Sequence, residues 1–148
     1  MANTLNQKRR RAERTRAFLD VLCERFPACF SRQKASVKPL AIGIQTQLRK
    51  VLDADPALAD TPNWLIRQAL AHYTRSPAYL EAVIAGAERI DLEGNAVEPV
   101  TDAAIALARD RRAEQKARAA ARRRERAAAD AEKRHQARLE QLARHFNR

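Results

Sequence analysis

The chain is poor in the residues that build large cores. Its 148 residues include only seven aromatic side chains, three glycines, two cysteines and one tryptophan. The hydrophobic fraction is 45%, but much of it is alanine, which buries little surface. These shortages predict a single domain with a small core, with or without tails.

Motifs for catalysis and for metal or cofactor binding are also missing. The three histidines are His72, His135 and His145, and no Gly-rich phosphate loop or HExxH pattern occurs. Cys23 and Cys29 are too few for a metal cluster, and we interpret them as two small buried residues rather than as a redox or ligand pair. We therefore expect a protein that is not an enzyme, with no catalytic residues, no metal and no cofactor.

Long apolar runs are absent as well. The N-terminus is polar and then basic, without the apolar segment of a signal peptide, and no stretch has the length of a membrane span. We expect a soluble protein of a reducing compartment, the cytoplasm, that does not bind a membrane.

Positive charge is abundant and unevenly placed. The net charge is +11 and the pI is near 10.8, values typical of proteins with a polyanionic partner, nucleic acid above all. Residues 1–38 carry +7, residues 39–100 carry −3 and residues 101–148 carry +7. Basic segments of this kind add affinity without selectivity, because they neutralise phosphates and release counterions. Any selectivity must then come from a shaped site in the middle of the chain.

The pattern of apolar residues predicts a mainly helical fold. A helical stripe starts at Phe18 and ends at Pro27, and another helix begins at Ile44 after a short extended segment, 39–44. Thr61 followed by Pro62 predicts a helix whose free amides are capped by the Thr61 hydroxyl, and Ser76–Pro77 predicts a second, shorter one.

The second half of the chain adds a hairpin and a basic tail. Segments 89–92 and 96–100 flank Gly94 and Asn95, both available for positive φ, which predicts a small β-hairpin. Thr101 and Asp102 cap a last helix. Residues 111–126 are rich in Arg and Ala and have little to bury, which predicts a protruding or frayed basic helix.

The predicted starts of the two middle helices point to an anion site. Free amides at a helix N-terminus bind phosphate, and Arg75 and Arg89 could point at the same anion. Tyr79 could stack on a base or a sugar. The alternative is that Tyr73 and Tyr79 are half-buried core aromatics and the arginines form a solvated rim.

Five short motifs, in order, resemble the ProQ/FinO family of bacterial RNA chaperones. They are RFPACF (25–30), KPLAIGI (38–44), IRQAL (66–70), YTRSPAYL (73–80) and GAERIDLEGN (86–95). The resemblance covers roughly Phe18 to Val100. It departs from the family at Ala41, Ala71 and Ala78, where relatives often carry basic residues, and we expect the basic segments to compensate.

The resemblance implies a mainly α fold with a small β-hairpin, divided as an N-terminal extension (1–16), an RNA-binding domain (17–110) and a basic C-terminal helix or tail (111–148). It implies an RNA chaperone without catalysis that binds terminator-like hairpins with single-stranded 3′ tails on small RNAs and mRNA 3′ ends. We expect a monomer, because no long apolar seam appears in the sequence. It places a pocket for the 3′ end at the YTRSPAYL and GAERIDL segments and hairpin phosphates at the helix start near residue 61. The site residues carried over are Lys38, Thr61, Arg67, Tyr73, Thr74, Arg75, Ser76, Tyr79, Arg89 and Asp91.

Two other functions remain open from the residues alone. The helices at 44–52 and 62–73 could form a DNA-binding helix-turn-helix, although the connection between them is long and broken by proline. The Arg/Ala-rich helix could instead dock this chain, as an adaptor, on an acidic protein or a ribosome.

Overall fold

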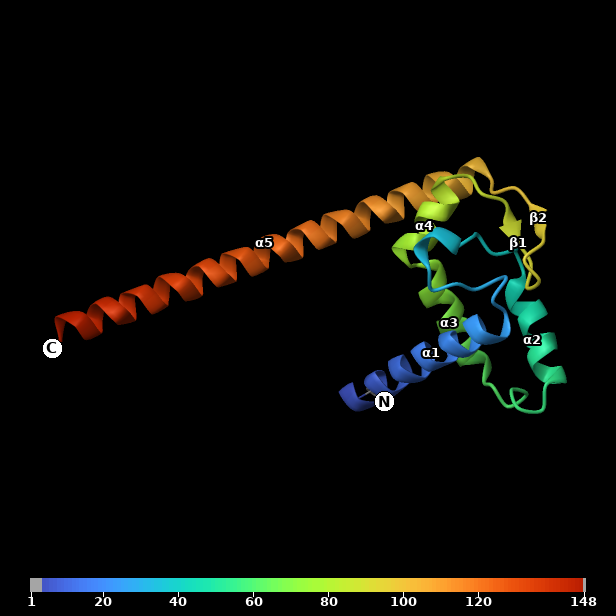
Figure 1. Ribbon diagram of the computed structural model, residues 1–148, viewed down its shortest axis with the longest axis horizontal. Coiled ribbons are helices and arrows are strands. Elements are labelled where there is room, and N and C mark those ends of the chain that lie inside the picture. The colour runs from blue at the N-terminus through green and yellow to red at the C-terminus, as the bar shows by residue number, and fades with distance from the viewer. Residues whose placement is uncertain (1–3, 148) are drawn as a thin grey trace. The chain divides into compact units, whose positions relative to one another are not determined.

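The computed structural model describes residues 4–147, so the outermost ends of the two predicted basic tails, residues 1–3 and Arg148, lie outside the described residues. The elements follow in the order α1 (Leu5–Arg25), a short 3₁₀ turn (Lys34–Ser36), α2 (Ile44–Ala54), α3 (Asn63–Thr74), α4 (Pro77–Ile84), β1 (Arg89–Ile90), β2 (Ala96–Glu98) and α5 (Asp102–Phe146) (Figure 1). The prediction of a mainly helical fold with one small hairpin is confirmed. The chain divides after Asp110 into two compact units.

The core of the first unit lies between α1, α2, α3 and α4. Helix α1 packs along α3, and α3 in turn packs against α2 and α4. Each helix turns a stripe at 3.6-residue spacing inward, as the sequence predicts. The buried residues of these stripes include Phe18, Leu19, Leu22, Leu48, Leu52, Leu65, Ile66, Ala69, Leu70, Leu80 and Val83.

Two of the three predicted helix caps are confirmed. The Ser76 hydroxyl accepts a hydrogen bond from the Tyr79 amide at 3.2 Å, and the Thr101 hydroxyl accepts one from the Ala104 amide at 3.1 Å. The third prediction is wrong, because Pro62 rather than Thr61 occupies the N-cap position of α3. The Thr61 hydroxyl instead donates to the Leu58 carbonyl at 2.7 Å and closes the preceding turn.

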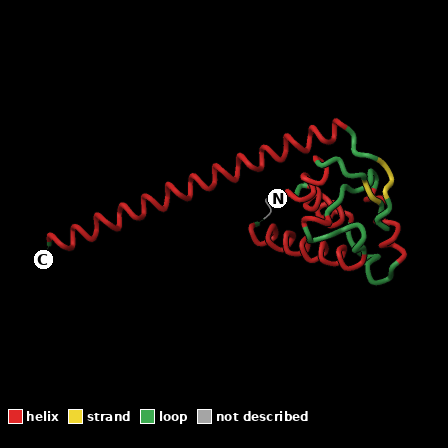
Figure 2. Tube along the Cα trace, turned by 45° about the horizontal axis from the view of Figure 1, so that its top comes forward, coloured by secondary structure: helices red, strands yellow, loops and turns green. Residues whose placement is uncertain are grey.

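The hairpin of β1 and β2 pairs antiparallel, with Arg89 opposite Glu98 and a bulge before Ile90. Figure 2 shows this hairpin among the loops of the first unit. Gly94 adopts φ +85°, and a β-carbon there would lie 2.9 Å from the β-carbon of Ala28, so only glycine fits. Of the two residues available for positive φ, Gly94 adopts it and Asn95 does not, since every positive φ among the described residues belongs to a glycine.

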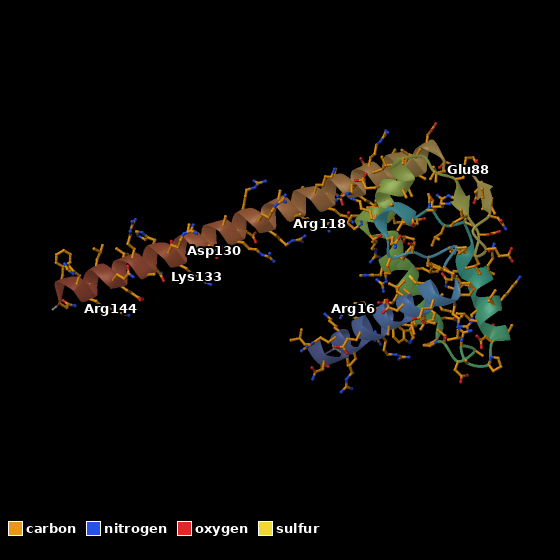
Figure 3. All side chains as sticks on the ribbon, viewed as in Figure 1. Arg16, Glu88, Arg118, Asp130, Lys133 and Arg144 are labelled. Atoms are coloured by element: carbon orange, nitrogen blue, oxygen red, sulfur yellow. The ribbon has the colours of Figure 1, made fainter. Side chains whose placement is uncertain are left out.

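Helix α5 is continuous from Asp102 to Phe146, so the predicted basic segment is helical and not frayed. Within the first unit, Ala108 is buried while Leu107 is half exposed. Figure 3 shows charged side chains along the rest of the helix, Arg118, Lys133 and Arg144 among them. None of the helices between residues 4 and 147 combines the length and the apolar character that crossing a bilayer requires.

Candidate nucleic-acid interface

The tyrosines of the YTRSPAYL segment hold a loop in place. The Tyr73 hydroxyl accepts a hydrogen bond from the Ser31 amide at 3.1 Å, and the Tyr79 hydroxyl accepts one from the Leu40 amide at 3.0 Å. The two rings meet edge to face with their centroids 5.9 Å apart. Both residues are only 7% exposed, which leaves a base little ring surface to stack on. Burial also raises the pKa of Tyr73, so this hydroxyl stays neutral.

Arg89 reaches the same loop from the hairpin. Its guanidinium donates to the Leu40 carbonyl at 2.9 Å, and the backbone of Ile90 pairs with Pro39 and Ala41. The structure therefore brings together Tyr73, Tyr79 and Arg89 of the predicted 3′-end pocket. It does so around residues 31–41, which we name the clamped loop.

Three more predicted site residues hydrogen-bond to nearby backbone. Thr74 donates to the Leu70 carbonyl at 2.9 Å, and Ser76 donates to the Tyr73 carbonyl at 2.8 Å in addition to capping α4. One Asp91 carboxylate oxygen accepts from the Glu93 and Asn95 amides, both at 2.9 Å, and shapes the hairpin turn. Lys38 is exposed within the clamped loop. Direct contact of these residues with a ligand stays a prediction.

A groove of about 790 Å³ lies at the amino end of α3, where α2 and α3 meet. Gly43, Thr46, Lys50, Asn63 and Arg67 are among its lining residues, and none of the described residues that line it is acidic. Because Asn63 begins α3, the positive end of the helix dipole opens on this α2–α3 groove. The groove thus offers a helix N-terminus together with exposed cations, which suits phosphate.

Arg49 builds this end of α3. Its guanidinium donates to the Ala59 carbonyl at 3.1 Å and to the Thr61 carbonyl at 2.5 Å, and it pairs with Asp53 at 2.7 Å. The guanidinium also donates a hydrogen bond to the Asn63 side-chain oxygen at 3.3 Å. One side chain therefore fixes both the loop before α3 and its first residue.

A second groove, of about 550 Å³, runs between α1 and α3. Arg16 lines it from α1, and Trp64, Arg67 and Arg75 line it from α3, with no acidic residue among the described lining. Arg67 and Arg75 are predicted site residues, and Arg67 is shared by both grooves. Arg16 and Trp64 were missed. Trp64, Gln68, Ala71 and Arg75 recur at helical spacing on one face of α3, and that spacing was the signal available in the sequence.

Two acidic residues of the middle region form contacts away from the lining of the grooves. Asp55 pairs with Arg25 at 2.8 Å, and the Glu98 carboxylate accepts from the Ile42 amide at 3.3 Å. Figure 3 shows Arg16 on α1 and Glu88 beside the hairpin in separate regions of the first unit. Acidic residues are thus absent from the described lining of both grooves, although Asp53 pairs with Arg49 at the edge of the α2–α3 groove.

The cysteines do not join either groove. Both are free thiols, and Cys29 is only 3% exposed. Burial raises the pKa of Cys29 to about 12, and it also raises the pKa of Cys23. Cys29 is thus the small buried residue that the sequence predicts.

Comparison with known proteins decides the family. The sequence model of the ProQ/FINO family matches residues 12–128, which is most of the chain. The chain belongs to the ProQ/FinO family. Among curated members, the RNA chaperone ProQ of Idiomarina loihiensis is 46% identical over 81 residues, 55% of this chain and 37% of the relative. That of Aeromonas salmonicida is 41% identical over 103 residues, 70% of this chain and 47% of the relative. The chain therefore matches less than half the length of these ProQ proteins.

Solved structures agree with this assignment. An NMR structure of a ProQ homologue from Legionella pneumophila is 33% identical, with a TM-score of 0.56 over 66% of this chain and 80% of the other. A crystal structure of a FinO-like RNA chaperone from Neisseria meningitidis is 30% identical, with a TM-score of 0.51 over 66% of this chain and 77% of the other. About two thirds of this chain thus shares its fold with these ProQ/FinO proteins.

Proposed function

We propose that this ProQ/FinO-family chain is a cytoplasmic RNA chaperone that binds structured RNA and catalyses no reaction. The observation that carries the proposal is the α2–α3 groove, where a helix N-terminus, Lys50 and Arg67 converge without an acidic lining residue. The relatives described as RNA chaperones support RNA as the polyanion. The target class that we propose is a terminator-like hairpin with a single-stranded 3′ tail, as on small RNAs and mRNA 3′ ends.

The groove suits the backbone of an RNA duplex. A-form RNA hides its base edges in a deep, narrow major groove, so proteins recognise the duplex by its shape and its phosphates. In this proposal the amino end of α3 and Arg67 take phosphates of the hairpin stem. The tail lies beside the clamped loop, where Lys38 is exposed and Arg89 is half buried.

The proposed role is to protect RNA 3′ ends and to promote pairing of complementary RNAs as a monomer. Protection requires only that the bound protein cover the end of the tail. Pairing is supported by the two basic ends of the chain, each +7, because they attract a second RNA without selecting its sequence.

A gel-shift competition tests the proposal. The labelled probe is a terminator hairpin with a U-rich tail, and the competitors are the same duplex as DNA and an unstructured RNA of equal length. The hairpin should compete best. Preference for the DNA duplex would support a DNA-binding protein instead, and no binding to any of the three would support an adaptor with a protein partner.

A further inference from the structure

The α1–α3 groove has chemistry that the α2–α3 groove does not contain. We propose that it is a second RNA site, which holds a stretch of phosphodiester backbone continuous, past Arg67, with the stretch held at the amino end of α3. The inference rests on the proposed function, because the ligand is the same RNA.

The two walls of the groove come from segments far apart in the sequence. Arg16 stands on α1, whereas Arg67 and Arg75 stand on α3, and all three are exposed at the groove. Guanidinium groups on facing walls, with no described carboxylate in the lining, favour an anion that lies between them. A volume of about 550 Å³ falls within the usual size range of small-molecule and cofactor sites.

The α1 wall of the groove contacts α3 through two arginine side chains. The guanidinium carbons of Arg11 and Arg14 lie 5.5 and 5.1 Å from the centre of the Trp64 ring, within the range of cation–π attraction. One turn further along α1, Thr15 is 5% exposed and its hydroxyl donates to the Arg11 carbonyl at 2.8 Å. Residues 11 and 14, which fall in the predicted N-terminal extension (1–16), thus contact α3 through their guanidinium groups.

Arg67 gives the two grooves continuity. It lines both of them, so a strand whose phosphate contacts Arg67 has a cationic path on either side. On the α1 side, Gln68 and His72 also line the groove and add hydrogen-bonding groups suited to a ribose hydroxyl or a base edge. The occupant that fits is therefore an RNA strand rather than an isolated phosphate.

Trp64 provides a direct readout, because it is the single tryptophan of the chain and lines only this groove of the two. The experiment titrates the full chain with the tailed terminator hairpin and follows tryptophan fluorescence and gel shift in parallel. The variants are Arg16→Gln and, as a matched control, Arg10→Gln. Arg10 is exposed on the same helix, but its side chain leaves the helix at an angle of about 120° around the axis from that of Arg16.

We expect Trp64 fluorescence to change with the same midpoint as the gel shift. Arg16→Gln should weaken binding about fivefold at roughly 0.1 M salt, the effect of one lost phosphate contact. Arg10→Gln should change binding by less than about twofold, since exposed charges at a distance are screened. The Arg16 side chain is exposed, and unchanged circular dichroism and thermal unfolding will confirm that each variant is folded.

Both results are required. If RNA shifts the protein but Trp64 fluorescence does not change, or if Arg16→Gln and Arg10→Gln bind alike, this inference is overturned while the proposed function stands. If the wild-type chain binds no RNA in the gel shift, both fail together.

Discussion

Tyr79 and Arg89 hold the same residue, Leu40, from two sides. The Tyr79 hydroxyl accepts from the Leu40 amide at 3.0 Å, and the Arg89 guanidinium donates to the Leu40 carbonyl at 2.9 Å. Helix α4 and the hairpin are thereby tied to the two peptide groups that flank the α-carbon of Leu40 in the clamped loop. The distinctive residues of the middle region thus first of all build the shape of the domain.

Tyr79→Phe should destabilise the fold by about 1–3 kcal/mol, because it leaves the amide of Leu40, a residue only 2% exposed, without its acceptor. Tyr73→Phe is the matched control, since it removes the acceptor of the Ser31 amide, and Ser31 is only partly buried. Urea unfolding of the three proteins measures the difference. An equal loss for both variants would show that burial at Leu40 is not the cause.

Arg67→Gln should weaken hairpin binding and lower the salt slope of the binding constant by about 0.7–0.9, the value for one phosphate contact. Arg67 is exposed and lines both grooves, so its removal should not affect folding. Affinities at several salt concentrations, compared with wild type, measure the slope. An unchanged slope would remove Arg67 from the interface.

Truncation after Asp110 removes the second unit, whose residues 111–126 carry eight basic and two acidic side chains. We expect affinity to fall for hairpin, duplex and single-stranded RNA alike, because contacts with phosphate do not select a structure. The salt dependence should flatten as well. A truncated chain that keeps the wild-type slope would show that this unit does not contact RNA.

The chemical group at the 3′ end of the RNA tail should change the binding affinity if that end lies beside Arg89 and Asp91. A terminal phosphate adds bulk and negative charge next to the Asp91 carboxylate, so binding should be weaker than with a free 3′ hydroxyl. An open basic surface predicts the opposite, because the ligand gains charge. The same hairpin with a 3′ hydroxyl, with a 3′ phosphate and without a tail provides the comparison, and equal affinities would leave only a general RNA binder.

Cys29 should make stability depend on pH in alkaline solution. Its pKa is about 12 in the folded chain against an ordinary value of 9.0, so the unfolded chain loses this proton first. The contribution of Cys29 to the free energy of unfolding is then fully present below pH 9 and is lost between about pH 9 and 12. Thermal unfolding of wild type and Cys29→Ala across this range tests the effect, and the variant should show a smaller decline. Identical declines would contradict it.

Local chemistry in the sequence predicts much of this fold. Ser76 and Pro77 begin α4 because a serine hydroxyl caps free amides and proline suits the first helical position. Gly94 forms the hairpin turn because glycine adopts positive φ without strain. The cap predicted at Thr61 is wrong because its hydroxyl donates to the Leu58 carbonyl instead. Arg49, twelve positions earlier, holds the Thr61 carbonyl, a contact that local spacing does not predict. The groove between α1 and α3 was missed for a similar reason. Arg16 and Trp64 are distant in sequence, and only tertiary packing brings them to one groove.

The separation of charge within the first unit has a kinetic consequence. Cations line the two grooves beside α3, whereas Glu88, Asp91, Glu93 and Glu98 lie in or beside the hairpin. A body charged in this way turns in the field of a polyanion before the two touch, so that productive encounters become more frequent at low ionic strength. We therefore expect the hairpin carboxylates other than Asp91 to affect how fast the proposed RNA complex forms more than how long it lasts.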